Sequence, residues 1–480
     1  MSDPLSLLPL ALASREGMID GAPATQHVAA GLTLLQRSAP LVRALTGRRA
    51  GILLPTGPAF LTALAASEGH GAVLMNPLAS APELAYQIAD ADIGAVFTSS
   101  ALAARLPGTT TIALLDDAPR SARVVVGGAA RDVDLGSHFA LQLEGDPDAA
   151  GSAEEAVVVY TSAMYGRPLG AILSHRNLLL VARSALRAAA ITSDDHALAA
   201  LPFAHLFGFV VTGVAPLLAG ASVTTMPRFN PVRALEIIER EGVTMFVGVP
   251  SMYIAMLDVL ERGGEPRPKA AMLRLCICGG APLAPEVQRR WEDLTGVELR
   301  QGYGLTEASS GCLFSDVTAP NVVGTLGRAY PGVEVSIRDV RTFAATPDGA
   351  VGEICVRGQT VFQGYVHAPG AAPRGLEIRD GWLRTGDLGA RRPDGSVEFH
   401  GLIKPMFTRN GFNIYPRELE AAIAELPGVT EVRVRSAPDP AKENSIVVDV
   451  RGVVSTDDVR LWCTARLSAY KQPSIINVAS

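Results

Sequence analysis

The chain has 480 residues, of which 48% are hydrophobic and 19% charged, and its formal net charge is −6. This length and composition predict a folded protein of two or three domains and exclude a disordered chain. The acidic balance argues against a nucleic-acid-binding surface, and the lack of any run of about twenty apolar residues argues against a membrane span.

Helix and strand patterns alternate through the first part of the chain. Residues 49–57 have the pattern of an apolar strand that ends in a turn, and residues 58–71 have helical spacing. Residues 72–77 are typical of a second short strand, and residues 83–99 repeat the helix-then-strand unit. Such alternation predicts a parallel sheet covered by helices.

A continuous apolar run at residues 154–162 predicts a central parallel strand that is buried on both faces. The longer segment Val157–Asn177, "VVVYTSAMYGRPLGAILSHRN", has the layout of a phosphate-binding loop. An apolar strand leads into a turn rich in hydroxyl groups and glycine, and a helix-like segment follows. The turn itself contains no lysine.

Units of a strand followed by a turn continue to about residue 322, and the sequence pattern then changes. Residues 232–253 read as helix, Gly242 turn and strand, and glycine turns also follow the strands within 272–283 and 296–307. From about Val323, short strands with glycine turns predict a β-rich subdomain. After Gly401 the sequence predicts a helix, a strand and a last helix, which starts near Thr456 because two aspartates follow this hydroxyl residue.

Together these patterns predict an α/β fold. We expect a large N-terminal domain, residues 1–400, made of two α/β subdomains with parallel sheets and a small β-rich subdomain. A small α+β C-terminal lid domain, residues 401–480, is expected to follow.

The cysteines and the N-terminus bear on the cellular compartment. Cys276 and Cys278 alternate along an apolar stretch, which favours buried thiols over a metal site. The N-terminal segment lacks the basic start of a secretory signal peptide. A reduced, cytoplasmic protein is therefore expected.

Six motifs occur in an order that resembles the AMP-forming acyl-activating superfamily, which comprises acyl-CoA synthetases, luciferases and adenylation domains. They are "YTSAMYGRPLGAILSHRN", "LPFAHLFG", "CGGAPL", "QGYGLTE", "GWLRTGDLG" and "GLIKPMFTRNGFNIYPRELE", and they extend from Tyr160 to Glu420. One such motif is weak evidence, whereas six in order at sensible spacing are strong evidence.

The resemblance assigns roles to individual residues of this sequence. It implies that Thr306 contacts the α-phosphate of ATP and that the Glu307 carboxylate holds Mg²⁺, which prefers oxygen ligands. It implies a cofactor-binding set of Thr161, Ser162, Gly166, Gly280, Ala281, Pro282, Gly302, Tyr303, Gly304, Asp387 and Lys404, in which 280–282 lie along the adenine and Asp387 binds the ribose. It implies an acyl-substrate set of Phe203, His205, Phe207 and Gly279.

Each motif also has a purely structural interpretation. The glycines of 279–283 can form a simple turn, a Thr–Glu pair often starts a helix, and Asp387 beside Gly386 can be a turn residue. The aromatic residues near His205 can equally well pack a core.

The sequence departs from the family pattern where the family carries positive charge. Leu169 and Leu402 stand where the resemblance implies a lysine and an arginine, and Ala163, Met164 and Tyr165 replace smaller or hydroxyl-bearing residues. The family also has a lysine beyond the element that reads "LSAYKQP" here, and the sequence ends at Ser480 before one appears. Since a cation at developing phosphate charge lowers a barrier by several kcal/mol, slower adenylation is expected.

The resulting hypothesis is an AMP-forming acid–thiol ligase. It would make an acyl-adenylate from a carboxylic acid and ATP with Mg²⁺, and pass the acyl group to coenzyme A or to the pantetheine of an acyl carrier protein. Because residues 203–207 offer no acid to pair with an ammonium group, a fatty or aryl acid is favoured. The charge losses leave two further hypotheses, specialisation for the transfer step and a non-catalytic protein that binds acyl or adenylate ligands or a partner.

Overall fold

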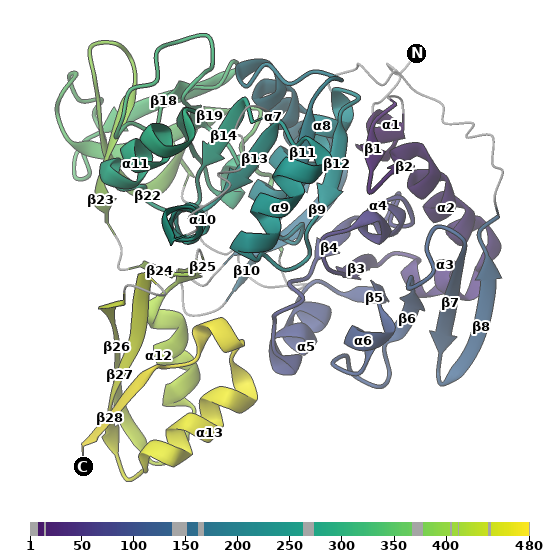
Figure 1. Cartoon of the computed structure of the whole chain (residues 1–480). Helices are drawn as coiled ribbons and strands as arrows, with labels where there is room; N and C mark the ends of the chain where they lie inside the picture. The colour runs from purple at the N-terminus through teal and green to yellow at the C-terminus, as the bar shows by residue number, and fades with distance from the viewer. Residues whose placement is uncertain are drawn as a thin grey trace.

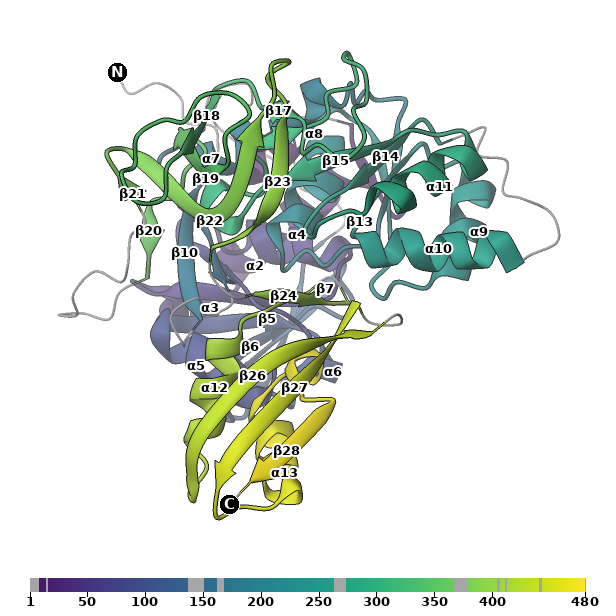
Figure 2. The ribbon, with the colours of Figure 1, turned by 90° about the vertical axis from the view of Figure 1, so that its left-hand side faces the viewer.

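The computed structural model describes residues 8–13, 16–136, 151–161, 168–262, 273–366, 378–403, 406–410, 412–439 and 443–479. A large body holds two extended sheets and a smaller β-rich sheet, and a small C-terminal unit is attached below it (Figures 1 and 2). This is the α/β architecture that the sequence predicts, with a large N-terminal part and a small C-terminal part.

The first sheet has the strand order β8-β7-β6-β5-β3-β4-β9-β10-β20. Its centre is parallel, and all six residues of β5 are buried, which explains its unbroken apolar sequence. Its strands are β3 (Arg49–Leu53), β4 (Ala72–Leu74), β5 (Ile93–Thr98), β6 (Thr111–Leu114), β7 (Ser121–Val126), β8 (Ala129–Asp134), β9 (Glu155–Thr161), β10 (Leu169–Ser174) and β20 (Gly364–Tyr365). Its helices are α2 (Ala24–Arg37), α3 (Ala39–Leu45), α4 (Pro58–Ala65), α5 (Ala81–Asp90) and α6 (Ser100–Ala103).

The second sheet has the order β17-β16-β15-β14-β13-β11-β12-β1-β2, and its core from β12 to β15 is parallel. Its strands are β1 (Met18–Ile19), β2 (Ala22–Pro23), β11 (His196–Ala199), β12 (Ser222–Thr225), β13 (Met245–Gly248), β14 (Leu275–Cys278), β15 (Leu299–Tyr303), β16 (Leu313–Phe314) and β17 (Arg328–Ala329). The associated helices are α1 (Leu8–Ala13), α7 (His175–Ala188), α8 (Ala215–Leu218), α9 (Pro231–Glu241), α10 (Pro250–Arg262) and α11 (Pro285–Thr295), with a π-helix η1 (Phe207–Val214) and a 3₁₀ turn η2 (Thr306–Ala308). Cys276 and Cys278 are buried on β14, as predicted.

The third sheet and the C-terminal unit complete the fold. The third sheet has the order β18-β19-β22-β21, with β23 paired to β22, over β18 (Val333–Arg338), β19 (Gly352–Gly358), β21 (Ile378–Arg379), β22 (Trp382–Arg391) and β23 (Val397–Leu402). The C-terminal unit contains β24 (Phe407–Arg409), β25 (Phe412–Ile414), α12 (Pro416–Ala424), β26 (Val429–Asp439), β27 (Glu443–Gly452), α13 (Thr456–Arg466), the 3₁₀ turn η3 (Ala469–Lys471) and β28 (Ile475–Ala479). Its last helix begins at Thr456, as predicted, and Ser455 caps it.

The structure corrects two expectations around the predicted phosphate loop. β9 is parallel to β4 but antiparallel to β10, so it is not a purely parallel strand. Residues 169–174 form strand β10 rather than a helix, and helix α7 starts only at His175. The antiparallel pairing of these residues with β9 explains this, and Gly170 permits a close approach, since a Cβ there would lie 2.8 Å from the Val158 side chain.

No described helix is long and apolar enough to cross a membrane.

Candidate active site

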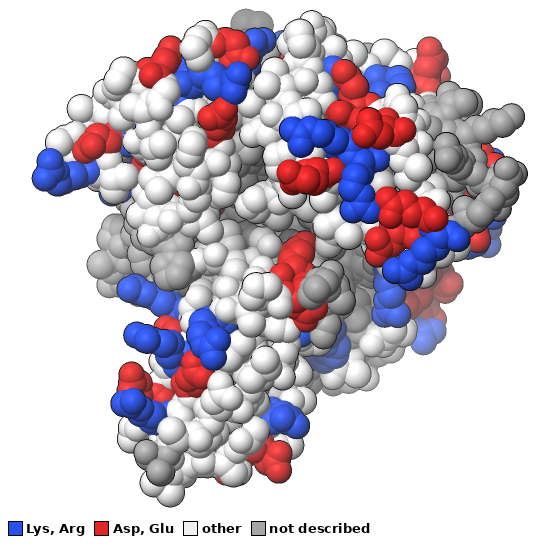
Figure 3. Space-filling view, turned by 60° about the vertical axis from the view of Figure 1, so that its left-hand side comes forward, with Lys and Arg blue, Asp and Glu red and all other residues white. Residues whose placement is uncertain are grey.

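A cavity of about 1410 Å³ lies where the two large sheets, the β-rich sheet and the C-terminal unit meet. Its lining includes residues from most of the quoted motifs, among them Thr161, His205, Tyr303 and Asp387. On the face shown in Figure 3, the small lobe is separated from the body by a hollow, and acidic and basic side chains are interspersed rather than gathered by sign.

One wall of the cavity consists of turns that follow β14 and β15. Gly280, Ala281, Pro282, Gly302 and Gly304 all line it. Gly280 has φ +78°, which favours glycine. A Cβ at Gly304 would lie 1.7 Å from the carbonyl oxygen of Ser310, so only glycine fits there. These turns leave backbone exposed to the cavity, where a flat ring can approach closely.

Asp387 on β22 and Tyr303 at the end of β15 meet across this wall. The Tyr303 hydroxyl donates a hydrogen bond to Asp387 Oδ2 at 2.5 Å. Burial raises the pKa of Asp387 to about 6; the Tyr303 hydrogen bond opposes this increase, and the charges of Glu353 and Glu307 add to it. A carboxylate in this position can accept hydrogen bonds from a diol.

Thr306 and Glu307 lie in the η2 turn, which is positioned by the preceding strand β15. Glu307 is 9% exposed, and its Oε1 accepts a 2.7 Å hydrogen bond from the Tyr365 hydroxyl. Burial raises the pKa of Glu307. No group of three or more acidic, histidine or cysteine side chains forms a metal cage among the described residues. A single carboxylate nevertheless fits Mg²⁺, which keeps waters and uses substrate phosphates as its other ligands.

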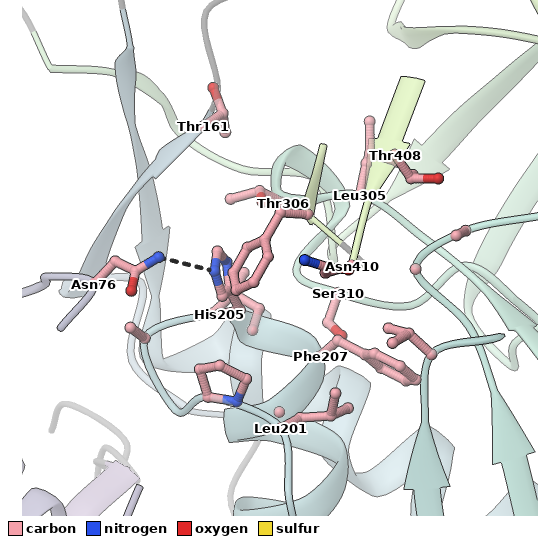
Figure 4. A pocket seen from close by; sticks show the side chains of 18 of the residues that line it. Asn76, Thr161, Leu201, His205, Phe207, Leu305, Thr306, Ser310, Thr408 and Asn410 are labelled. Carbon is pink, nitrogen blue, oxygen red and sulfur yellow. Dashed lines mark hydrogen bonds between the residues drawn. The ribbon is translucent and has the colours of Figure 1, made fainter. Parts of the chain in front are cut away.

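His205 stands at the junction between the body and the C-terminal unit (Figure 4). Its Nε2 lies 3.5 Å from the Asn76 side-chain amide, and its ring centroid is 5.8 Å from that of Phe412. Burial, with a smaller contribution from the charge of Lys471, lowers the pKa of His205 to about 4. His205 is therefore neutral at pH 7 and can donate or accept one hydrogen bond without adding charge.

The acyl-substrate set divides into lining and supporting residues. Phe203 and Phe207 line the cavity, but Phe203 is 1% exposed and packs edge-on against Phe60, at a centroid distance of 5.5 Å, so it mainly belongs to the core. Phe207 begins the π-helix η1, a geometry often found at functional sites. Gly279 lies behind it, where a Cβ would be 3.0 Å from the Phe207 ring.

The predicted phosphate loop is described only at its two ends. Thr161 and Leu169 face each other at the tips of β9 and β10, and both line the cavity. Leu402 also lines the cavity, so both positions that lack the expected cation are at the site. Ser162, Gly166 and Lys404, like residues 163–165, lie outside the described residues.

The structure adds site residues that the motifs did not single out. From the C-terminal unit, Thr408, Asn410, Phe412, Tyr415, Asn444 and Tyr470 line the cavity. Thr408 and Asn410 lie near Leu305 and Thr306 in Figure 4. From the body, Arg228 lines the rim, is exposed, and has no ion-pair partner among the described residues. The sequence signals for this wall were the motif "GLIKPMFTRNGFNIYPRELE", which contains Thr408 and Asn410, and the element "LSAYKQP", which contains Tyr470.

Comparison with known proteins identifies the family. The AMP-binding enzyme family matches residues 39–366. The feruloyl-CoA synthase of Amycolatopsis sp is 33% identical, in an alignment that covers 96% of this chain and 93% of that protein. The 4-coumarate–CoA ligase 5 of Oryza sativa subsp. japonica is 29% identical, with 93% and 83% covered.

Solved structures agree. A malonyl-CoA ligase in a ternary product complex with methylmalonyl-CoA and AMP superposes with a TM-score of 0.78 at 27% identity, with 96% of this chain and 95% of that chain covered. The o-succinylbenzoate CoA synthetase of Bacillus subtilis shares the fold, with a TM-score of 0.80 at 24% identity and coverage of 99% and 95%. The chain therefore belongs to the AMP-forming acyl-activating superfamily, and it is an enzyme of the acid–thiol ligase class.

Proposed function

We propose that this enzyme joins an aryl acid of the hydroxycinnamate type to coenzyme A through an acyl-adenylate. The observation that carries the proposal is that one cavity is lined by the turns at Gly280–Pro282 and Gly302–Gly304, by neutral His205 and by Arg228, which has no ion-pair partner within the described part of the chain. An adenylate, an acyl group and a thiol can therefore meet there without leaving the protein.

In the first half-reaction, a carboxylate oxygen of the acid attacks the α-phosphorus of ATP, and pyrophosphate leaves. Thr306 would donate its hydroxyl hydrogen bond to the α-phosphate, and Asp387 would accept hydrogen bonds from the ribose hydroxyls. Glu307 would hold Mg²⁺, which supplies positive charge to the phosphates when bound. Because His205 is neutral, it would orient the acid without repelling or neutralising the carboxylate.

In the second half-reaction, the thiol sulfur attacks the acyl carbonyl carbon, the thiol proton passes to solvent, and AMP leaves with the electrons of the acyl–phosphate bond. Phe412 and Tyr470 would cover the adenylate and exclude water, because their rings stack at a centroid distance of 4.4 Å beside His205. Arg228 would bind a phosphate of coenzyme A at the rim.

The apolar acyl wall supports an acid with an uncharged body. Phe207, Val249 and Met252 line the cavity, and an apolar lining with few polar groups suits an aromatic or aliphatic chain. Acid-dependent ATP–pyrophosphate exchange tests this with ferulate, 4-coumarate, benzoate, fatty acids and sulfoacetate. The proposal expects exchange with the arylpropenoic acids first. Exchange with sulfoacetate alone would refute it.

The acceptor is tested through Arg228. Pantetheine has the thiol of coenzyme A but lacks its nucleotide phosphates, so Arg228→Ala should raise the KM for coenzyme A by roughly 10-fold and leave the KM for pantetheine unchanged. An equal effect on both acceptors would remove this role. If a holo acyl carrier protein reacts faster than coenzyme A, the carrier is the acceptor.

We also propose that the enzyme favours the transfer step, since Leu169 and Leu402 put apolar side chains where the family carries cations. Thioester formation from preformed feruloyl-AMP should therefore be faster than the overall reaction from ferulate and ATP. Equal rates would show that adenylation is not limiting.

A further inference from the structure

Lys471 lies in a buried ion cluster that joins the C-terminal unit to the body. Lys471 is the only one of the four lysines that falls within the described residues. Its Nζ donates to Glu83 Oε1 at 2.9 Å and to Glu418 Oε1 at 2.5 Å. The side chains of Lys471, Glu83 and Glu418 are 6%, 15% and 7% exposed.

The two carboxylates come from different parts of the protein. Glu418 is on α12 and Lys471 on η3, both in the C-terminal unit, whereas Glu83 is in the first turn of α5 in the body. If the C-terminal unit moved away, Lys471 would keep Glu418 but lose Glu83. The contact with Glu83 is therefore the part of the cluster that depends on the docked arrangement.

Further hydrogen bonds converge on the same point. Ser468 donates its hydroxyl to Glu83 Oε2, and that oxygen also accepts the backbone N–H of Ser80 at 2.7 Å. The Ser80 hydroxyl donates to the carbonyl of Arg466 at 2.7 Å. The start of α5 thus contacts the end of α13 and the η3 turn through several polar groups, and α13 faces α5 in Figure 1.

Helix α5 is itself fixed to the candidate active site. One turn after Glu83, Tyr86 donates its hydroxyl to the carbonyl of Pro168 at 2.9 Å, directly before β10. The ion cluster also lies next to the two aromatic rings that are proposed to cover the adenylate, because Tyr470 directly precedes Lys471 and stacks on Phe412. The η3 turn is held to β24 by Arg409, which donates to the carbonyl of Gln472 at 2.6 Å.

We propose that Glu83 is a positioning residue for thioester formation. By binding Lys471 and Ser468 it docks the C-terminal unit on α5, and this places Phe412 and Tyr470 beside His205. The inference rests on the proposed two-step function for its catalytic consequence, but the docking itself does not depend on the identity of the acid.

The variant that tests this is Glu83→Gln. Glutamine keeps the side-chain length and can still serve the capping box of α5 with Ser80, whereas it removes the negative charge that faces Lys471. The matched control is Glu155→Gln, which removes a carboxylate from the ion pair with Arg49 inside the body, at 2.6 Å. A milder second variant, Ser468→Ala, removes one hydroxyl donor to Glu83.

The first measurement needs no substrate. Hydrogen–deuterium exchange of the unliganded full-length protein should show faster exchange across residues 81–90 and 456–471 in Glu83→Gln, with a smaller increase in Ser468→Ala and none in Glu155→Gln. Unchanged exchange in Glu83→Gln would overturn the docking role, whether or not the enzyme activates any acid.

The second measurement separates the half-reactions. With feruloyl-AMP and coenzyme A, Glu83→Gln should slow thioester formation at least about 10-fold, which corresponds to about 1.4 kcal/mol. Ferulate-dependent pyrophosphate exchange should stay within about twofold of the wild type. A purely structural role would slow both half-reactions alike, and that result would refute the positioning role. A wild type that is inactive with every acid would refute the proposed function and leave the exchange measurement as the test of docking.

Discussion

Replacing Leu169 with lysine should strengthen ATP binding. Leu169 is the first residue of β10, is 6% exposed and lines the cavity opposite Thr161. The family pattern has a lysine in this position. Among the described lining residues, the acids Glu307 and Asp387 face the cavity, and Arg384 is already paired with Glu353 at 2.7 Å. The other described cation of the lining, Arg228, is exposed, so a new ammonium group at position 169 would add positive charge to a lining that also holds two carboxylates.

The expected changes in ATP affinity and in stability follow from the hydrogen bond gained by the lysine and the apolar burial lost with the leucine. A charge-assisted hydrogen bond to a phosphate contributes about 1.5–3 kcal/mol, so the Kd for ATP should fall roughly 10- to 100-fold. Full burial of a leucine contributes about 1.5–3 kcal/mol. Since the lysine stem keeps part of that apolar contact while its charge reaches the cavity, the free energy of unfolding should fall by only about 1–2 kcal/mol.

Titration calorimetry of ATP with Mg²⁺, together with pyrophosphate exchange, measures the gain, and urea denaturation measures the loss in stability. Leu169→Met is the matched control, because methionine is of similar length and carries no charge. If Leu169→Lys folds but binds ATP no better than Leu169→Met, then the missing cation at this position does not limit nucleotide binding, and the charge argument fails.

Three other changes test separate parts of the site. Adenosine, which has no phosphate, should bind about tenfold more weakly for each pH unit below about 6. Burial raises the pKa of Asp387 to about 6, and the protonated acid is a poorer hydrogen-bond acceptor for the ribose. Calorimetry measures this pH dependence, which should be absent in Asp387→Asn. Gly304→Ala should lower the free energy of unfolding by about 2 kcal/mol or more, since the new Cβ would lie 1.7 Å from the Ser310 carbonyl oxygen. Gly302→Ala is the control, because its new Cβ would have its nearest contact at 3.7 Å. Urea denaturation should show that this second variant is tolerated. Phe412→Ala removes ring contacts with His205 and Tyr470, which together contribute about 1–3 kcal/mol. This variant should slow thioester formation from feruloyl-AMP about tenfold or more, while pyrophosphate exchange persists. An equal loss in both assays would contradict a role confined to the transfer step.

The sequence predicted the fold where the signal is local. Apolar runs and glycine turns identified β3, β5, β13 and β14, because strands buried on both faces need continuous apolar residues. It misplaced β10, since "LGAILS" has no strong preference, and pairing with β9 across the loop decides its conformation. The π-helix η1 likewise has no known local signature, and the packing around Phe203 and Phe207 accompanies it.

Motif residues could be located by resemblance, but their partners could not. The hydrogen bond from Tyr365 to Glu307 joins positions 58 residues apart, and that from Tyr303 to Asp387 joins positions 84 residues apart. The contact of Lys471 with Glu83 spans 388 residues and depends on how the C-terminal unit docks. Such contacts arise only from tertiary packing, so composition and spacing contain no trace of them.

The charges of the cavity connect these observations. Among the described lining residues, Glu307 and Asp387 are acidic, Arg384 is neutralised by Glu353, and Arg228 is an unpaired cation at the rim. A triphosphate brings several negative charges into this space, whereas an acyl-adenylate brings one. These described residues therefore offer little positive charge to offset the negative charge of ATP, and under the proposed function Arg228 would bind the incoming acceptor. Under the proposed function, adenylation would therefore depend on Mg²⁺ for positive charge, whereas the transfer step, in which charge leaves with AMP, would depend more on the docked aromatic residues than on cations.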